Sequence, residues 1–319
     1  MKKKKSLIVS TGSNLSSNLI IKPIKKKVWL FLIPTFICFL IGFVWPFITG
    51  IYLSFCEFRL IREALFIPID KIKDIFVGFS NYVRAFNDPS FKKAFLYTSE
   101  YAIVSVLIIN VISFLLAYLL TQKIKGSNLF RAVFFMPNLI GGIVLSYIWQ
   151  LIFNGILIKY NTYLTANQEF GFWGLVILMA WQQIGYMMII YIAGFQSVSE
   201  DILEAAKIDG ANKRQTLFRV IVPNMMSTIT VCTFLSLTNS FKLYDQNLAL
   251  TGGAPVMTMA DGTQVKMTEM LALNISSSFG KINTWAKGTA QAKAVIFFIM
   301  VAAISLIQLK ATKSKEVQQ

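Results

Sequence analysis

The sequence has 319 residues, of which 55% are hydrophobic and only 14% are charged, and its mean hydropathy of +0.60 indicates a membrane protein and excludes an ordinary soluble domain. It contains no histidine, which excludes imidazole metal sites and Ser-His-Asp triads. The formal charge of +16 comes largely from short basic blocks without interleaved aromatic residues, so we expect no nucleic-acid partner.

Six apolar stretches are long enough to cross a bilayer, which takes roughly 20 helical residues. We expect spans at residues 28–56, 95–121, 130–153, 170–195, 225–241 and 290–309. They predict an all-α membrane protein with a basic tail over residues 1–27, a transmembrane domain over 28–309 and a short tail over 310–319. Inside the spans we expect almost no ionisable groups, with Glu100 and Lys242 near span ends, which argues against proton- or sodium-coupled carriers.

The distribution of lysine and arginine predicts that both termini lie in the cytoplasm. With this orientation the cytoplasmic segments are the shorter ones and carry more than half of the 31 basic residues, in agreement with the positive-inside rule. Residues 57–94 and 242–289 then form two large segments outside. We therefore expect a multi-pass protein of the bacterial cytoplasmic membrane, surrounded by the lipid bilayer.

Residues 197–223, between the fourth and fifth spans, predict an amphipathic helix-turn-helix at the cytoplasmic face. Ser197 and Glu200 have the spacing of a capping box, and Gly210 is suited to the left-handed conformation that ends a helix. We expect Pro223 to end the second helix. An ordinary interfacial loop would show the same amphipathicity, so this pattern alone does not assign a function.

The residue identities in this loop resemble a known motif. Glu204-Ala205-Ala206, followed by Gly210 and then Val220-Ile221-Val222-Pro223, is similar to the EAA loop, E-A-A-x3-G-x9-I-x-L-P, of permease subunits of bacterial binding-protein-dependent ABC importers. Other segments resemble the carbohydrate branch of this family, which includes the maltose permeases. They are residues 32–34, 45–46, 76–82, 131–137 and 251–255, the last with one residue more than the family's turn.

The resemblance implies the fold of a type I ABC importer permease, with six transmembrane helices and a cytoplasmic coupling helix that docks in a cleft of a separate ATPase. The coupling residues that it implies are Glu204, Ala205, Ala206, Asp209, Gly210, Ala211 and Pro223. The implied partners are a second homologous permease subunit, two cytoplasmic ATPase subunits and an extracytoplasmic substrate-binding protein. The chain has no G-x4-G-K-[ST] phosphate loop, so we expect ATP to bind the ATPase subunits and this chain to hold no cofactor, metal or catalytic residue.

Polar and aromatic residues in the fourth and fifth spans are suited to a sugar, because amides and hydroxyls bond its hydroxyl groups and aromatic rings stack on its faces. The candidates are Trp181, Gln183, Tyr186, Ser236, Asn239 and Ser240. The same residue types often hold transmembrane helices together, and for any single residue both interpretations stay open. The resemblance places Tyr186, Ser236 and Ser240 near sugar contacts of the maltose permeases, which favours pathway lining for the group.

We therefore expect a subunit that forms half of the translocation pathway for a sugar or oligosaccharide. One alternative is a permease for another solute, such as an organic phosphate ester, which would require basic groups in the cavity. An alternative from another class is a membrane-embedded transferase enzyme, which would require a catalytic base or a metal at membrane depth.

Overall fold

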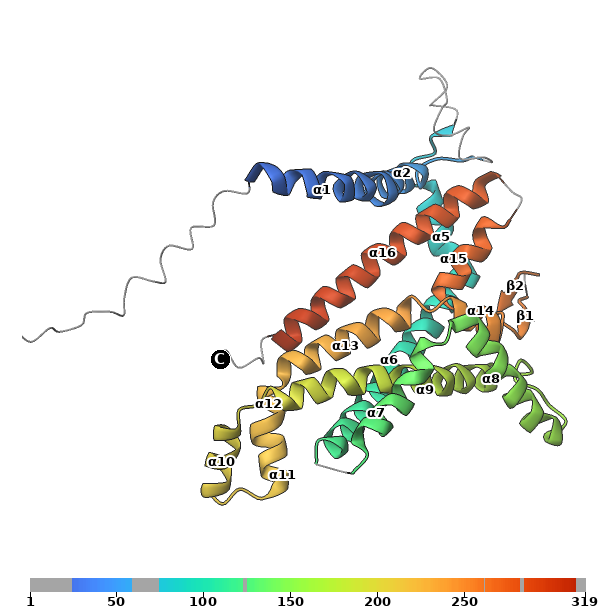
Figure 1. Cartoon of the computed structure of the whole chain (residues 1–319). Helices are drawn as coiled ribbons and strands as arrows, with labels where there is room; N and C mark the ends of the chain where they lie inside the picture. Colours follow the sequence, from blue (N-terminus) through green and yellow to red (C-terminus); the bar gives the residue numbers. More distant parts are fainter. Residues whose placement is uncertain (1–24, 59–74, 123–124, 261, 282–283, 314–319) are drawn as a thin grey trace, which may run out of the picture. The chain divides into compact units, whose positions relative to one another are not determined.

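The computed structural model describes residues 25–58, 75–122, 125–260, 262–281 and 284–313, which are almost entirely helical (Figure 1). Most of the predicted basic tail and most of the predicted C-terminal tail lie outside these residues, and α1 already begins at Lys25, inside the predicted tail. The chain divides into two units after Gly50.

The first unit holds most of the first candidate span, Leu32–Leu53. Helix α1 (Lys25–Phe39) continues through a five-residue π turn, η1 (Leu40–Val44), into α2 (Trp45–Leu53). Pro46 follows this π turn directly. A proline ring normally collides with the carbonyl four residues earlier, and the wider π turn moves that carbonyl away. The span therefore continues through Pro46, as the sequence predicts.

The second unit is built from the remaining helices and one small hairpin of strands. Its first half contains α5 (Ser80–Asn87), α6 (Pro89–Leu120), α7 (Ser127–Phe135), the 3-10 turn η3 (Met136–Leu139), α8 (Gly142–Leu157), the 3-10 turn η4 (Ile158–Tyr160) and α9 (Gln168–Gln196). Its second half contains α10 (Glu200–Ile208), α11 (Lys213–Gln215), the π turn η5 (Thr216–Ile221), α12 (Val222–Asn224), α13 (Met226–Phe241), α14 (Asp245–Leu250), β1 (Val256–Thr258), β2 (Gln264–Lys266), α15 (Leu271–Phe279) and α16 (Thr284–Lys313).

Four of the six expected spans correspond to single helical stretches of the described chain that are long and apolar enough to cross a membrane, namely Leu32–Leu53, Pro89–Leu120, Gln168–Gln196 and Ala286–Lys313. A fifth such stretch, Gly142–Tyr160, covers only the second part of the expected span at 130–153. The expected span at 225–241 is α13, which reaches this length only together with Lys213–Asn224, from which it is bent by 71°. The expected span at 130–153 needs a correction, because the 3-10 turn that contains Pro137 breaks it into α7 and α8.

Helices α6 and α9 form the centre of the second unit. One buried cluster, which includes Tyr97, Leu175 and Leu250, joins them to α8 and α14. A second, which includes Ile109 and Met187, joins them to α13. In α9, 61% of the most apolar stretch is buried, compared with 17% in α16. Helix α16 therefore keeps most of its apolar surface for lipid or for another subunit.

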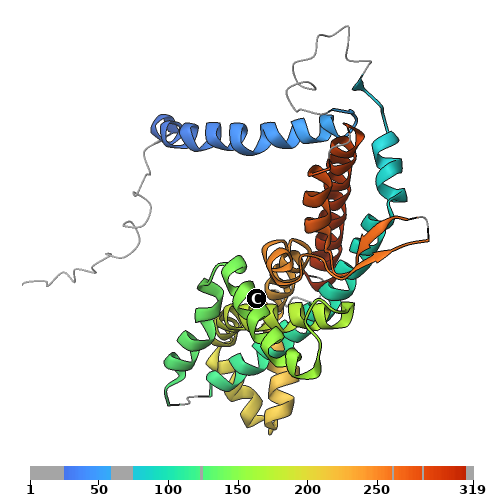
Figure 2. The same ribbon diagram turned by 90° about the vertical axis from the view of Figure 1, so that its right-hand side faces the viewer.

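The predicted outside segment at 242–289 is a folded cap rather than a loop. Strands β1 and β2 pair antiparallel, with Val256 opposite Lys266. The Asn247 amide donates to the Thr268 carbonyl at 2.8 Å and accepts from the Met270 N–H at 2.9 Å. The cap lies at the end of the unit opposite to α10 and α11 (Figures 1 and 2).

Candidate functional site

The candidate site is the helical hairpin of residues 200–224, which projects from one end of the second unit (Figure 1). Its first arm is α10, and the chain turns at Gly210, whose φ is +76°. The Gly210 N–H donates to the Lys207 carbonyl at 3.1 Å, and the Ala211 N–H donates to the Ala206 carbonyl at 3.0 Å. This pair of bonds is the Schellman arrangement that a left-handed glycine permits. The predicted glycine turn is therefore confirmed.

The second arm of the helical hairpin begins with a capping box that the sequence analysis did not identify. The Asn212 side chain accepts from the Gln215 N–H, and the Gln215 side chain accepts from the Asn212 N–H, both at 2.9 Å. The arm then runs through η5 and α12 to Asn224. Each bond gives an acceptor to a backbone N–H group that has no partner within the helix, at Asn212 and at Gln215. The second arm therefore has a defined first residue.

Two local expectations for the helical hairpin were wrong. The Ser197 hydroxyl donates to the Gly194 carbonyl at 2.8 Å, so it belongs to the end of α9, and the residue that precedes α10 is Ser199. Pro223 does not end the second arm, because the π turn η5 precedes it and makes room for its ring. The direction changes instead at Met225, between α12 and α13.

The surface of the helical hairpin mixes charged groups with apolar side chains. Ile208 is 86% exposed and Phe218 is 59% exposed. Among the expected coupling residues, the exposed ones are Glu204, Ala205, Asp209 and Gly210; Ala206 is buried, and Ala211 and Pro223 are half-buried. A protein cleft accommodates both kinds of group, and so does a membrane surface, on which an amphipathic helix lies with its charged face in water.

The expected pathway residues fall into two separate groups. On α9, Trp181 is exposed and meets Trp149 edge to face with ring centroids 5.5 Å apart, while Gln183 and Tyr186 are half-buried. The Gln183 Oε1 atom is buried without a hydrogen-bond partner. On α13, Ser236 and Ser240 are buried and Asn239 is half-buried. Among the described residues, no hydrogen bond joins the three α9 side chains to the three on α13.

Ser236 and Ser240 take part in hydrogen bonds between helices. The Ser236 hydroxyl accepts from the Asn110 amide at 2.7 Å, and the Asn110 carbonyl oxygen accepts from the Tyr191 hydroxyl at 2.8 Å. Ser240 pairs with Ser105 at 3.0 Å. Asn110 was missed in the sequence, although an amide inside an apolar span is a visible signal. These bonds join α6, α9 and α13 at the depth of the spans.

The expectation about ionisable groups also needs a correction, because Lys293 lies inside the expected span at 290–309 and is 1% exposed. Its ammonium donates to the Asp88 carboxylate at 2.6 Å. Burial acts to raise the pKa of Asp88, but the bond and charge of Lys293 and the Ser90 N–H outweigh it and hold this pKa below its usual value. A lysine within an apolar stretch is a signal that sequence reading can detect.

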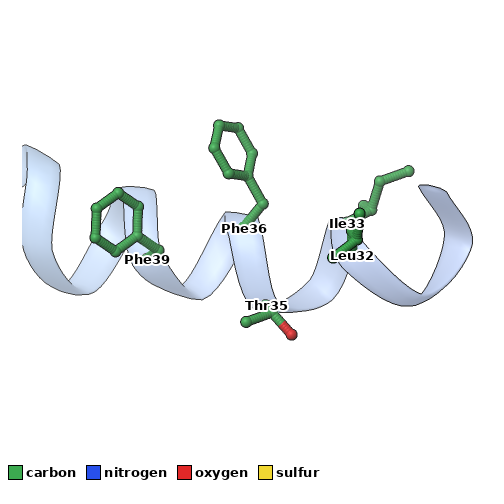
Figure 3. Close-up of a pocket in the computed structure, with 5 residues that line it drawn as sticks. All are labelled: Leu32, Ile33, Thr35, Phe36 and Phe39. Carbon is green, nitrogen blue, oxygen red and sulfur yellow. The ribbon is translucent and has the colours of Figure 1, made fainter. Parts of the chain in front are cut away.

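Two hollows on the described surface differ in chemistry. One, of about 500 Å³, is lined by Leu32, Ile33, Thr35, Phe36 and Phe39, all on α1. Figure 3 shows these side chains extending in different directions from a single helix, which fits a surface wetted by lipid better than a solute site. The other, of about 510 Å³, is polar and is lined by Arg84, Asn87, Asp88, Thr263, Lys281 and Thr289.

Known proteins resemble this chain over most of its length. Residues 109–310 match the family "Binding-protein-dependent transport system inner membrane component". The chain is 40% identical over 298 residues, 91% of its own length and 95% of the relative's, to a probable starch degradation products transport system permease protein of Thermoanaerobacterium thermosulfurigenes. It is 30% identical, over 91% of its length and 96% of the relative's, to a multiple sugar-binding transport system permease protein of Streptococcus mutans.

A solved structure shares the fold. It is the crystal structure of a bacterial ABC transporter involved in the import of the acidic polysaccharide alginate, with a TM-score of 0.70 at 19% identity, over 92% of this chain and 98% of that one. The expected importer-permease fold is thereby confirmed. The helical hairpin that turns at Gly210, the apolar spans and these relatives agree with one another. The chain belongs to the family of inner-membrane components of binding-protein-dependent transport systems.

Proposed function

We propose that this chain is a membrane subunit of a sugar ABC importer, and that it forms half of the translocation pathway without hydrolysing ATP. The observation that carries the proposal is the helical hairpin, whose Gly210 turn presents Glu204, Asp209 and the apolar Ile208 on one projecting element. Such an element is suited to dock in a protein cleft. ATP hydrolysis is assigned to two separate ATPase subunits that receive the helical hairpin in the cytoplasm.

The proposed orientation follows from this assignment. With the helical hairpin in the cytoplasm, both termini are cytoplasmic and the cap of α14, β1, β2 and α15 faces outward. A second homologous permease completes the pathway, and an extracytoplasmic binding protein delivers the solute to the cap. The relatives support such an assembly, because one solved complex is an alginate transporter together with a periplasmic protein bound to an alginate pentasaccharide.

The proposed solute is an oligosaccharide, in the first place a product of starch degradation, since that is what the 40% identical relative is named for. A second candidate is an organic phosphate ester, because a relative that is 25% identical is named as an sn-glycerol-3-phosphate permease. The buried Lys293 is the basic group that such a solute would need, but its ammonium is already bonded to Asp88, Asn274 and Ser278. The sugar is therefore favoured.

Proteoliposomes that contain the whole importer, with the second permease, the ATPase subunits and the binding protein, test the function. We expect ATP-dependent uptake of maltotriose and none of sn-glycerol 3-phosphate. Uptake of the phosphate ester alone would favour the second candidate. A membrane chain that converted the sugar without ATPase subunits would be a transferase and would contradict the proposal.

Within this proposal, Trp181, Gln183, Tyr186 and Asn239 contact the solute, while Ser236 and Ser240 shape the pathway wall through their bonds to α6. Tyr186→Ala should then lower uptake for each folded complex, and because its ring also packs against a buried cluster it should lower the melting temperature as well. Ser236→Ala should lower the melting temperature, because it removes one of the two acceptors of the Asn110 amide, the other being the Val106 carbonyl at 2.8 Å, at a cost of about 1–3 kcal/mol. Wild-type uptake by Tyr186→Ala would remove this residue from the pathway.

A further inference from the structure

The strongest feature outside the helical hairpin is the cation of Lys293. Its ammonium donates to Asp88 Oδ2 at 2.6 Å, Ser278 Oγ at 2.9 Å and Asn274 Oδ1 at 3.1 Å, and it lies 5.4 Å from the centre of the Phe91 ring. All three hydrogens of the ammonium therefore have an oxygen partner. Such complete pairing is what allows a lysine to be 1% exposed in a membrane helix.

The network extends from Lys293 to the cap. The Asn274 amide also donates to the Glu269 carboxylate at 2.8 Å, and the Ser277 hydroxyl donates to the same carboxylate at 2.9 Å. Glu269 in turn lies 3.5 Å from the ammonium of Lys266 on β2. One connected set of polar groups therefore joins the start of α6, the small hairpin of strands, α15 and α16.

The hydrogen bonds of Lys293 in this network are shorter than two others that α16 makes to other elements, since those from Thr289 to Asn81 and from Gln308 to Thr230 measure 3.4 and 3.5 Å. Farther along the helix, Ile296, Met300 and Ile304 pack against the cluster that contains Phe241 and Leu271. Apolar contacts tolerate small sliding movements, whereas a charge pair with three directed bonds fixes direction and distance. The polar network therefore sets the geometry at the cap end of α16.

The polar hollow lies directly at this network. The lining of the polar hollow includes Asp88, the partner of Lys293, and also Thr263 and Lys281 of the cap. The shape of this outer surface thus depends on the relative placement of α6, α15 and α16, which the network determines. The helical hairpin lies at the other end of the same unit (Figures 1 and 2).

We propose that Lys293 is a positioning residue that holds the cap and the outer ends of α6 and α16 as one surface for the docked binding protein, and so links docking to ATP hydrolysis at the helical hairpin. The inference rests on the proposed function. Lys293 thus takes part in coupling although its side chain contacts neither the solute nor the ATPase.

The decisive variant is Asp88→Asn combined with Lys293→Met. Removing both charges avoids an unpaired buried ion, which is the most damaging consequence of a single change, while it abolishes the ion pair. In proteoliposomes with the complete importer and maltotriose-loaded binding protein, we expect basal ATP hydrolysis to stay at the wild-type level. The stimulation by binding protein should fall about tenfold, within the usual range of coupling between sites.

A second variant keeps both charges. Asn274→Ala cuts the connection between Lys293 and Glu269 but leaves the bond from Lys293 to Asp88, and stimulation should fall severalfold. The matched control is Ser113→Ala, which removes another buried hydrogen bond, to the Ile184 carbonyl at 2.9 Å, far from the network in sequence. It should lower the melting temperature with normal stimulation.

The outcomes separate the inference from the proposed function. A wild-type complex that binding protein does not stimulate would contradict the function itself. A stimulated wild type, together with normal stimulation in the double variant or in Asn274→Ala, would overturn the role of Lys293 alone. If Ser113→Ala lost stimulation to the same degree, the effect would reflect general destabilisation, and the inference would also fail.

Discussion

Gly210→Val tests the geometry of the helical hairpin, because the structure separates backbone strain from crowding at this position. The φ of Gly210 is +76°, and a β carbon placed there would have no atom within 4 Å. The substitution therefore costs only the left-handed backbone conformation, about 1–2 kcal/mol for a residue with a β carbon, with a β-branched residue at the upper end. Since 1.4 kcal/mol is tenfold in an equilibrium, about 2 kcal/mol lowers the population of the docking-competent turn by up to roughly 25-fold.

The assay is copurification of the ATPase subunits with the chain, together with ATP hydrolysis stimulated by binding protein. We expect Gly210→Val to weaken both while the chain still inserts in the membrane and still binds the binding protein. Gly210→Asn is the matched control, because asparagine tolerates the left-handed region and meets the same open space. If Gly210→Val coupled normally, or if Gly210→Asn lost coupling to the same degree as Gly210→Val, the left-handed turn at Gly210 would not be required for coupling to the ATPase.

Three further predictions concern stability and orientation. The pKa of Asp88 lies below its usual value, so the contribution of this carboxylate to stability is complete above about pH 4 and is lost as the pH falls through the folded pKa. The melting temperature of the purified wild-type complex should therefore decline more steeply in acid than that of the Asp88→Asn complex. Equal slopes for the two complexes would refute this. Gly288→Ala would drive a β carbon into a backbone carbonyl, whereas Gly155→Ala meets nothing within 4 Å; the first should lower the melting temperature, by an overpacking cost of about 1–3 kcal/mol, and the second should not. For orientation, a cysteine at Ser80 should react with an impermeant maleimide in intact cells and one at Ser127 should not, and the reverse pattern would invert the proposed topology.

The sequence by itself determined the features that depend on local composition and on short spacing. Hydropathy located most of the spans, since a bilayer requires about 20 apolar residues in a row, but it did not reveal the break at the turn that contains Pro137. Gly210 could be recognised in advance, because the left-handed end of a helix favours a residue without a β carbon. The resemblance of the EAA loop indicated the family before the fold was known.

Only the tertiary structure decided which polar groups meet. Asp88 and Lys293 are 205 residues apart in the chain, and Asn110 and Ser236 are 126 apart, so no periodicity within one helix could pair them. The course of the second arm past Pro223 was likewise decided by the π turn ahead of it, which hydrophobic spacing does not reveal. Whether a polar side chain inside a span bonds a neighbouring helix or faces a pathway depends on the rotation of that helix against its neighbours, and packing across the whole unit sets this rotation.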